Sequence, residues 1–481
     1  MSEFDRRDLL LLSAASLTWT MTLGGCEKLI KDIKNRPLRR DIRNMAANDP
    51  TLQVYRDGIA RMQALDRGDP RNWLRQAQIH LNNCPHGNWF FLPWHRAYLM
   101  SLERIIRKLT GEASFAMPYW DWRCQRSVPA PFWENGSILN PATPPSHADY
   151  AFTRVAGPSD LADVSVVGPS AIAGMLNETD FELFASGAAT ALRNGGGFKA
   201  PLEAGPHDYI HASFIRGTMR TFVSPLDPIF WLHHNILDYF WFEWNSRGNP
   251  NTNDTVWTNF QLSGMFVDGD GAPADYQVGA LILAPLLSYR FETPTGCIRG
   301  TDRVDEAVLK RFLERGTAIR FRPTREFPMA ARGLRLDIGR AARTQFSIPA
   351  EAVRLSAVAE AGQRMLLRLD NVQAPNADFY VRVFVDLPDG AQASPDSPNY
   401  AGAFAFFNGG EGHHLAYNYM VDLSPTLARL AQARGLSSGD PVITFVTVPN
   451  EGQRAAASAG IAIGAVTPLL ISRREVPQSL R

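Results

Sequence analysis

Histidine is the residue type that most constrains this chain, because seven of its ten histidines fall in two short stretches. The first stretch, Gln78 to Arg104, contains His80, His86 and His95. The second contains a His-x-x-x-His pair and then a tandem pair: His207, His211, His233 and His234. Imidazole suits Cu, Zn, Fe and Ni. Three histidines from each stretch would make two all-nitrogen metal sites, so we expect a fold that brings the stretches together.

The bulk composition sets wider limits. With 481 residues the chain is long enough for two or three domains. Its 45% hydrophobic and 20% charged residues are ordinary for a globular protein, and a formal net charge of +1 gives no reason to expect a nucleic acid partner. Four cysteines are too few for a disulfide scaffold of this length. Cys124 and Cys297 could pair in an oxidising compartment, although the sequence alone does not place them.

Residues 1–26 are interpreted as an export signal. Arg6 and Arg7 precede an apolar stretch, Leu9 to Leu23, that is shorter than the about 20 residues of a membrane-spanning helix. Paired arginines ahead of an apolar core are typical of the twin-arginine route. The stretch ends in Leu-Gly-Gly-Cys, which resembles a lipobox and makes Cys26 a candidate for lipidation. Lipid-anchored and freely soluble export both stay open, and either places the protein in the periplasm or at the cell surface.

The next segments predict a tether and then a helical domain. Residues 27–48 are basic and polar, as in a tether, and residues 49–249 carry the helical patterns. Asp49-Pro50 and Asp69-Pro70 look like helix starts. The first predicted helix to carry a histidine is Arg71 to Asn82, with His80 near its end. A second predicted helix begins at Pro93, and His95 lies in its first turn.

The second stretch repeats this arrangement. His207 and His211 are four residues apart, so both lie on one helical face and can share a metal. The zinc-protease motif has this spacing but requires Glu after the first His, where this chain has Asp208. Phe91 precedes His95 by four residues, and Phe230 precedes His234 by four. Ordinary core packing would explain either Phe alone, but matched positions favour rings that fix the ligand imidazoles.

Together these motifs resemble the type 3 copper proteins, which are the tyrosinases, catechol oxidases (polyphenol oxidases) and hemocyanins. The first-copper pattern is matched by His80, Cys84, His86, Phe91 and His95. The second-copper pattern, H-x-x-x-H followed by D-P-x-F-x-x-H-H-x-x-x-D-x-x-W, is matched between His207 and Trp241. The match covers about residues 50–248, and the segment Met117 to Trp122 is similar to one in plant and bacterial polyphenol oxidases.

The resemblance implies a mainly α domain with a four-helix bundle core that holds two copper ions. It implies three ligands to the first ion, His80, His86 and His95. The implied ligands of the second ion are His207, His211 and His234. His233 would then support the ligands without binding metal. Asp238 is expected to orient its neighbours through hydrogen bonds or a pair with an Arg such as Arg96.

The resemblance also implies roles for three further residues. Cys84 would form a thioether to His86, with a free thiol or an extra copper ligand as the alternatives. Glu203, four residues before His207, would hold a water near copper, with a surface glutamate as the alternative. Asp208 stands where many enzymes that hydroxylate monophenols have Asn, so that activity stays open.

The C-terminal half has a different pattern. Residues 250–340 are expected to be a linker region, and residues 341–472 an antiparallel β-sandwich, with alternating runs such as Phe379 to Leu387. Residues 473–481 would be a tail. The β-sandwich is similar to the C-terminal domain of plant and bacterial polyphenol oxidases, which implies a lid that keeps the enzyme latent. His413 and His414 lie in a Gly-rich loop and are interpreted as a feature of that loop.

We therefore expect a copper oxidoreductase that uses dioxygen to oxidise o-diphenols to o-quinones. An o-aminophenol oxidase would use the same metal chemistry. A hemocyanin-like oxygen carrier is the alternative from a different class, and a chain with an export signal and without repeats argues against it. The expected partners are a phenolic small molecule and dioxygen, with membrane contact through a lipidated N-terminus.

Overall fold

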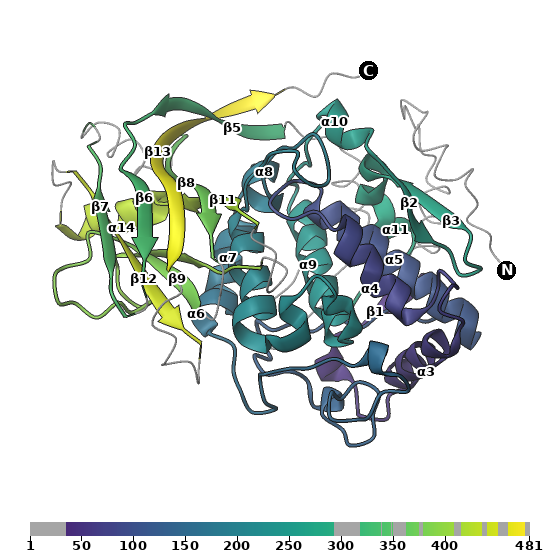
Figure 1. Cartoon of the computed structure of the whole chain (residues 1–481). Coiled ribbons are helices and arrows are strands. Elements are labelled where there is room, and N and C mark those ends of the chain that lie inside the picture. Colours follow the sequence, from purple (N-terminus) through teal and green to yellow (C-terminus); the bar gives the residue numbers. More distant parts are fainter. Residues whose placement is uncertain are drawn as a thin grey trace.

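The computed structural model has a helical part up to Phe291 and a β-rich part from Ala318 onward (Figure 1). It describes residues 35–292, 318–337, 339–347, 349, 362–374, 379–407, 415–434, 440–450 and 460–476. The proposed export signal with Cys26, the cysteine at 297 and the His413-His414 pair lie outside these residues. Within them, every helix is too short or too polar to cross a membrane.

Four elements of the helical part carry the histidines. They are α4 (Trp73–Asn83), α5 (Phe91–Thr110), the consecutive π-helices η4 (Glu203–His207) and η5 (Tyr209–Ile215), and α9 (Ile229–Ser246). All 18 residues of α9 are buried, as expected of a helix at the centre of a domain. Helix α5 packs between α9 and α3 (Pro50–Ala64).

Side-chain caps decide where these helices begin. Asp49 accepts the backbone N–H of Thr51, so α3 starts at Pro50, as predicted. Helix α4 begins at Trp73, later than the sequence suggested, because Asn72 accepts the N–H of Leu74 while Asp69 and Pro70 form the preceding turn. Gly111, with a φ of 81°, ends α5 in the left-handed conformation.

The segment before α3 belongs to the helical part. Strand β1 (Leu38–Arg39) pairs in parallel with β4 (Arg290–Phe291), and Arg39 is fully buried. Its guanidinium donates to Glu103 on α5 and to Asn235 and Asp238 on α9. The chain from Leu38 onward, which the sequence placed in a basic tether, is therefore folded into the domain and holds two of its helices together.

The segment expected to be a linker is also folded. Strands β2 (Gln261–Val267) and β3 (Pro273–Gln277) form an antiparallel hairpin against α5. Four residues of this hairpin belong to the hydrophobic core of the helical part: Leu262, Phe266, Ala274 and Tyr276. Helices η8 (Val278–Leu283) and α11 (Ala284–Leu287) then lead to β4.

The β-rich part is an antiparallel sandwich. One sheet has the order β10-β9-β12-β7, and the other has β11-β8-β13-β5 with β6 also on β13. Their core contains residues of both sheets, such as Leu367 and Ile463 from one and Val381 and Phe445 from the other. In chain order the strands are β5 (Ala318–Glu326), β6 (Ala331–Leu336), β7 (Ala342–Gln345), β8 (Gln363–Gln373), β9 (Phe379–Val385), β10 (Tyr400–Phe404), β11 (Tyr417–Asp422), β12 (Val442–Pro449) and β13 (Ile461–Val476).

The predicted β-sandwich is confirmed, but it starts earlier and ends later in the chain than expected. Strands β5 and β6 precede residue 341, and β13 continues into the expected tail as far as Val476. Helix α14 (Ser424–Arg434) follows β11 and packs on β8 and β10. The sandwich lies against the helical part on the side of α6 (Val164–Val167) and α7 (Pro169–Leu176) (Figure 1).

Candidate metal centre

The first three predicted ligands form a buried triangle. His80 lies on α4, His86 in the loop after it, and His95 in the first turns of α5. Their ring centroids are 5.7 Å (His80–His86), 5.7 Å (His80–His95) and 5.8 Å (His86–His95) apart. Three helical or loop segments therefore converge on one point, as a metal site requires.

The other three predicted ligands form a second triangle. The ring centroid distances are 4.6 Å for His207–His211, 5.2 Å for His207–His234 and 5.3 Å for His211–His234. The sequence predicted an α-helix for the first two, but they lie on π-helices, with Pro206 inside η4. The triangles adjoin, because the rings of His95 and His234 stack at 4.1 Å where α5 meets α9.

Hydrogen bonds at Nδ1 prepare four of these rings for coordination. Nδ1 of His80, His95 and His211 faces the backbone carbonyls of Phe222, Phe91 and Met219 at 2.7, 2.8 and 2.6 Å. Nδ1 of His207 faces Asp208 Oδ1 at 2.8 Å. Because each partner only accepts, the proton of the neutral ring sits on Nδ1 and the Nε2 lone pair points away from these partners.

With the proton on Nδ1, Nε2 is the nitrogen that such a ring offers to a metal. Within the described part of the chain, Nε2 of His80, His86, His95 and His207 is buried without a hydrogen-bond partner. Leaving buried polar nitrogens unpaired is unfavourable. Metal ions would satisfy these lone pairs, so the residues present fit a pair of metal sites.

Burial keeps the rings neutral. Removal from water lowers the pKa of His95 and of His211 to about 3. The same cause, reinforced by neighbouring imidazoles, holds the pKa of His80, His86, His207 and His234 well below the usual value. Only neutral imidazole binds metal, so all six rings are in the binding form at neutral pH.

The chain is also similar to known proteins. The family described as the common central domain of tyrosinase matches residues 69–179 and 170–247, and a domain of unknown function (DUF7868) matches residues 326–467. A tyrosinase of Hahella sp. is 26% identical over 440 residues, which cover 80% of this chain and 90% of that protein.

The chain belongs to the tyrosinase and polyphenol oxidase family of type 3 copper proteins. Streptomyces antibioticus tyrosinase is 33% identical over 34% of this chain and 64% of its own length. The fold is that of the solved latent apple tyrosinase, with a TM-score of 0.65 and 19% identity over 91% of this chain and 97% of that chain.

In this member of the family, His233 adjoins the second triangle, with ring centroids 5.5 Å from His207 and 4.9 Å from His211. The indole of Trp122 donates to His233 Nδ1 at 3.3 Å. The neutral ring then has its proton on Nε2 and offers no lone pair there. This hydrogen bond favours His234, rather than His233, as the third ligand of the second site.

The two matched phenylalanines pack as predicted. The ring centroid of Phe91 lies 4.9 Å from that of His95 and 4.7 Å from that of His207. The ring centroid of Phe230 lies 4.2 Å from that of His234 and 5.1 Å from that of His80. Each phenylalanine ring therefore restrains one histidine of the first triangle and one of the second.

Cys84 lies beside the first triangle. It is a buried free cysteine, and its Sγ lies within 4.8 Å of possible ligand atoms of His80 and His86. Arg193 Nη2 donates to Sγ at 3.3 Å, while burial raises the pKa of the thiol to about 12. Cys124, in contrast, is disulfide-bonded, and its pairing with Cys297 stays a prediction because Cys297 is outside the described residues.

The two acidic residues singled out from the sequence are both buried, Glu203 beside the loop of His86 and Asp208 beside His207. Glu203 accepts the N–H of Gly87 at 2.7 Å and the hydroxyl of Ser186 at 2.6 Å, and burial raises its pKa to about 7. Burial also raises the pKa of Asp208, to about 6, against the opposing charge of Lys199. Lys199 Nζ donates to Asp208 Oδ2 at 2.5 Å. No sequence motif marked this lysine.

Asp238 supports the helices one turn beyond His234. Arg96 Nε donates to it at 2.5 Å, which confirms the predicted partner, and Arg39 Nη1 donates at 2.6 Å. The hydroxyl of Tyr289 donates to it as well. The last two partners lie far from Asp238 in sequence and were not predicted.

The β-sandwich contributes Phe407, which covers the metal centre of this tyrosinase relative. It follows β10, is fully buried, and its ring centroid lies 4.5 Å from that of His211 and 4.9 Å from that of His86. One ring thus contacts a histidine of each triangle.

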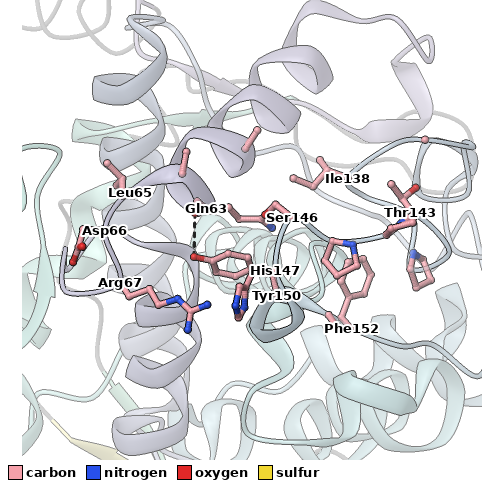
Figure 2. A pocket seen from close by; sticks show the side chains of 17 residues that line it. Gln63, Leu65, Asp66, Arg67, Ile138, Thr143, Ser146, His147, Tyr150 and Phe152 are labelled. Carbon is pink, nitrogen blue, oxygen red and sulfur yellow. Dashed lines mark hydrogen bonds between the residues drawn. The ribbon is translucent and has the colours of Figure 1, made fainter.

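A separate cavity of about 950 Å³ opens between the end of α3 and the loop around Ser146 (Figure 2). His147 is the one histidine that lines it, and Tyr150 donates to the carbonyl of Gln63 across it at 3.1 Å. None of the six ligand candidates lines this cavity, so it is not an approach to the metal centre.

Proposed function

We propose that this protein oxidises o-diphenols to o-quinones with dioxygen at a binuclear copper site. The observation that carries the proposal is the pair of adjoining triangles, in which four of the six buried, neutral imidazoles present unpartnered Nε2 atoms and the other two, His211 and His234, turn Nε2 toward each other at 3.1 Å. A site made only of imidazoles suits copper, and the family supplies the expectation of two ions. Copper held by these histidines would supply the redox chemistry that joins oxidation of the phenol to reduction of dioxygen.

The residues around the triangles orient the ligands and exclude water. Carbonyl groups and Asp208 hold the Nδ1 protons, while the rings of Phe91 and Phe230 fill the space between imidazoles. Glu203 is proposed to hold a water that takes the phenol proton. This role is supported by the position of the Glu203 carboxylate, which hydrogen bonds from Gly87 and Ser186 hold beside His86.

Asp208 bears on whether monophenols are hydroxylated. One carboxylate oxygen faces His207, and the other accepts from Lys199. A carboxylate engaged on both sides has little capacity to accept a proton from an incoming phenol. We therefore propose diphenol oxidation as the principal activity, with monophenol hydroxylation weaker.

The β-sandwich is proposed to be a lid that keeps the enzyme latent. Phe407 stands where a phenolic ring would approach both triangles, and two of the solved structures with this fold are of latent enzymes. Arg364 of β8 donates to Glu178 of the helical part at 2.6 Å, and Arg382 of β9 donates to Asp163 at 2.7 Å. These ion pairs would hold the lid closed.

Two covalent modifications are proposed. Cys84 would form the thioether to His86, which would leave the crosslinked peptide lighter by two hydrogens in a mass spectrum. Export by the twin-arginine route with lipidation of Cys26 would leave the protein in the membrane fraction, and a Cys26→Ser variant would appear in the soluble fraction.

One experiment tests the proposed function. The protein is loaded with copper, the metal is counted, and oxygen consumption is followed with catechol, tyrosine and o-aminophenol before and after detergent. We expect two ions per chain and rapid turnover of catechol after detergent, with slower turnover of tyrosine. One ion or none, or no oxygen consumption with any of the three after detergent, would overturn the proposal.

A further inference from the structure

Lys199 is buried in the contact between the two parts of the protein, with no exposed surface. Its ammonium donates to Asp208 Oδ2 at 2.5 Å and to the carbonyl oxygen of Phe407 at 3.3 Å. It also lies 4.3 Å from the ring centroid of Tyr417 and 4.0 Å from Glu203 Oε1. A buried ammonium is tolerated only where such partners replace water.

The partners of Lys199 come from both parts of the chain. Asp208 and Glu203 belong to the helical part, whereas the Phe407 carbonyl and the Tyr417 ring belong to the β-sandwich. The ammonium therefore has its full set of partners only when the sandwich is in place.

The backbone at Lys199 joins the same two parts. Its N–H donates to Asn418 at 2.7 Å and its carbonyl accepts from Met420 at 3.2 Å, which forms a parallel bridge to β11. Nearby, the N–H of Ala405 donates to the carbonyl of Ala204 at 2.8 Å. Lys199 is thus fixed from both ends of its side chain.

The neighbouring turn is shaped to accept β11. Gly87, next to His86, has a φ of 74°, and a Cβ there would lie 2.9 Å from a ring carbon of Tyr417. Only glycine allows the Tyr417 ring to approach so closely. That ring therefore contacts both the first triangle's loop and the ammonium of Lys199.

A continuous series of contacts leads from the lid to a candidate copper ligand. The Phe407 carbonyl accepts from Lys199, Lys199 donates to Asp208, and Asp208 faces Nδ1 of His207 at 2.8 Å. The same residue, Phe407, places its ring over the metal centre. Covering the site and orienting one of its ligands therefore depend on one set of contacts.

We propose that Lys199 is a positioning residue that couples closure of the β-sandwich to the orientation of His207, through Asp208. This inference rests on the proposed function, since it assumes that His207 binds copper. When the sandwich leaves, Lys199 loses the Phe407 carbonyl and the Tyr417 ring, and water reaches the Lys199–Asp208 pair. A hydrated ion pair is weak, so Asp208 then restrains His207 less firmly.

The test uses full-length, copper-loaded protein and two measurements without substrate. The first is the rate at which a chelator removes copper, and the second is the rate of limited proteolysis in mild detergent, which reports release of the sandwich. Lys199→Met should speed copper loss about tenfold, as changes beside a metal ligand do. It should speed proteolysis about tenfold or more, because a hydrogen bond from a charged donor is lost.

Three further variants make the test specific. Lys108→Met is the matched control, because Lys108 pairs with Asp270 on the surface, and it should change neither rate. Asp208→Asn should speed copper loss by itself. Adding Lys199→Met to Asp208→Asn should then speed proteolysis as before but speed copper loss by less than it does in the wild-type background, since only opening of the sandwich remains and the route through Asp208 is already removed. This double variant lacks the unpaired carboxylate and is the one to measure if Lys199→Met alone does not fold.

The coupling is overturned if Lys199→Met changes only one of the two rates or neither. It is also overturned if Lys199→Met speeds copper loss as much in the Asp208→Asn background as in the wild type. Failure of the proposed function would differ, because the wild-type protein itself would then take up one copper ion or none.

Discussion

At the scale of single residues, the metal centre depends on where each imidazole keeps its proton. Four rings have an acceptor at Nδ1, whereas His233 has a donor there, the indole of Trp122. One hydrogen bond therefore separates a ring that can bind metal through Nε2 from one that cannot.

Trp122→Phe should weaken this distinction. Without the indole donor, His233 can move its proton to Nδ1 and compete with its neighbours for the second metal, so we expect copper loss to a chelator to become about tenfold faster. Trp133→Phe is the control, because Trp133 Nε1 has no hydrogen-bond partner among the described residues. Equal copper retention in both variants would contradict this role of Trp122.

Glu203 should make stability depend on pH. Its pKa rises by burial from the ordinary 4.5 to about 7 in the folded protein, so the folded state keeps a proton that the unfolded state has released. The stability that this proton supplies is full below pH 4.5 and is lost as the pH rises through about 7. In the metal-free protein, Glu203→Gln should flatten this fall, measured as the urea midpoint between pH 4.5 and 7. An unchanged slope would contradict the prediction.

At the scale of elements, the N-terminal strand β1 holds the two central helices together. Arg39 bridges Glu103 on α5 and Asp238 on α9, and its guanidinium lies 3.4 Å from the ring centroid of Tyr289. Helix α5 carries His95 of the first triangle and α9 carries His234 of the second, so the strand supports the spacing of the metal sites.

Arg39→Met should therefore be strongly destabilising. It leaves two buried carboxylates short of a partner, and we expect a loss of about 3 kcal/mol or more in the free energy of unfolding. Arg61→Met removes an exposed pair with Asp57 and should lose less than about 1 kcal/mol. Urea denaturation of the two variants measures the difference, and similar losses would show that the bridge is not needed.

The sequence predicted the parts of the site that follow local patterns. Phe91 and His95, His207 and His211, and Phe230 and His234 each stand four residues apart, which is the spacing of one helical face, and the alternation in Phe379 to Leu387 marked strand β9. Arg39, Lys199 and Phe407 were missed because their partners lie far along the chain, as with the 208 positions that separate Lys199 from Phe407. Such contacts exist only after the parts have packed, and no short pattern records them.

At the scale of the whole molecule, the β-sandwich covers the helical part at its metal centre. The ring of Phe407 belongs to the core of the helical part, although the residue lies in the β-rich half of the chain. The two parts are therefore one body around the histidines rather than two domains joined at a distance.

Phe407→Ala should open this contact. Removing a large aromatic side chain from a core costs about 3 kcal/mol, which corresponds to about a 100-fold shift between closed and open protein. We expect oxygen consumption with catechol to appear without detergent. Met329→Ala, at an exposed position of the sandwich, is the control and should stay dependent on detergent. The same detergent dependence in both variants would contradict a lid held by Phe407.

Because the docked β-sandwich covers the histidines, it also sets the order in which the metal and the two parts of the chain come together. All six candidate ligands are at most 8% exposed, so an ion in solution has no direct path to them once the sandwich has docked. The helical part precedes the sandwich in the chain and is made first during synthesis. Copper should therefore reach its nitrogens before the later part docks, and folded metal-free protein should take up the metal only as fast as its two halves separate.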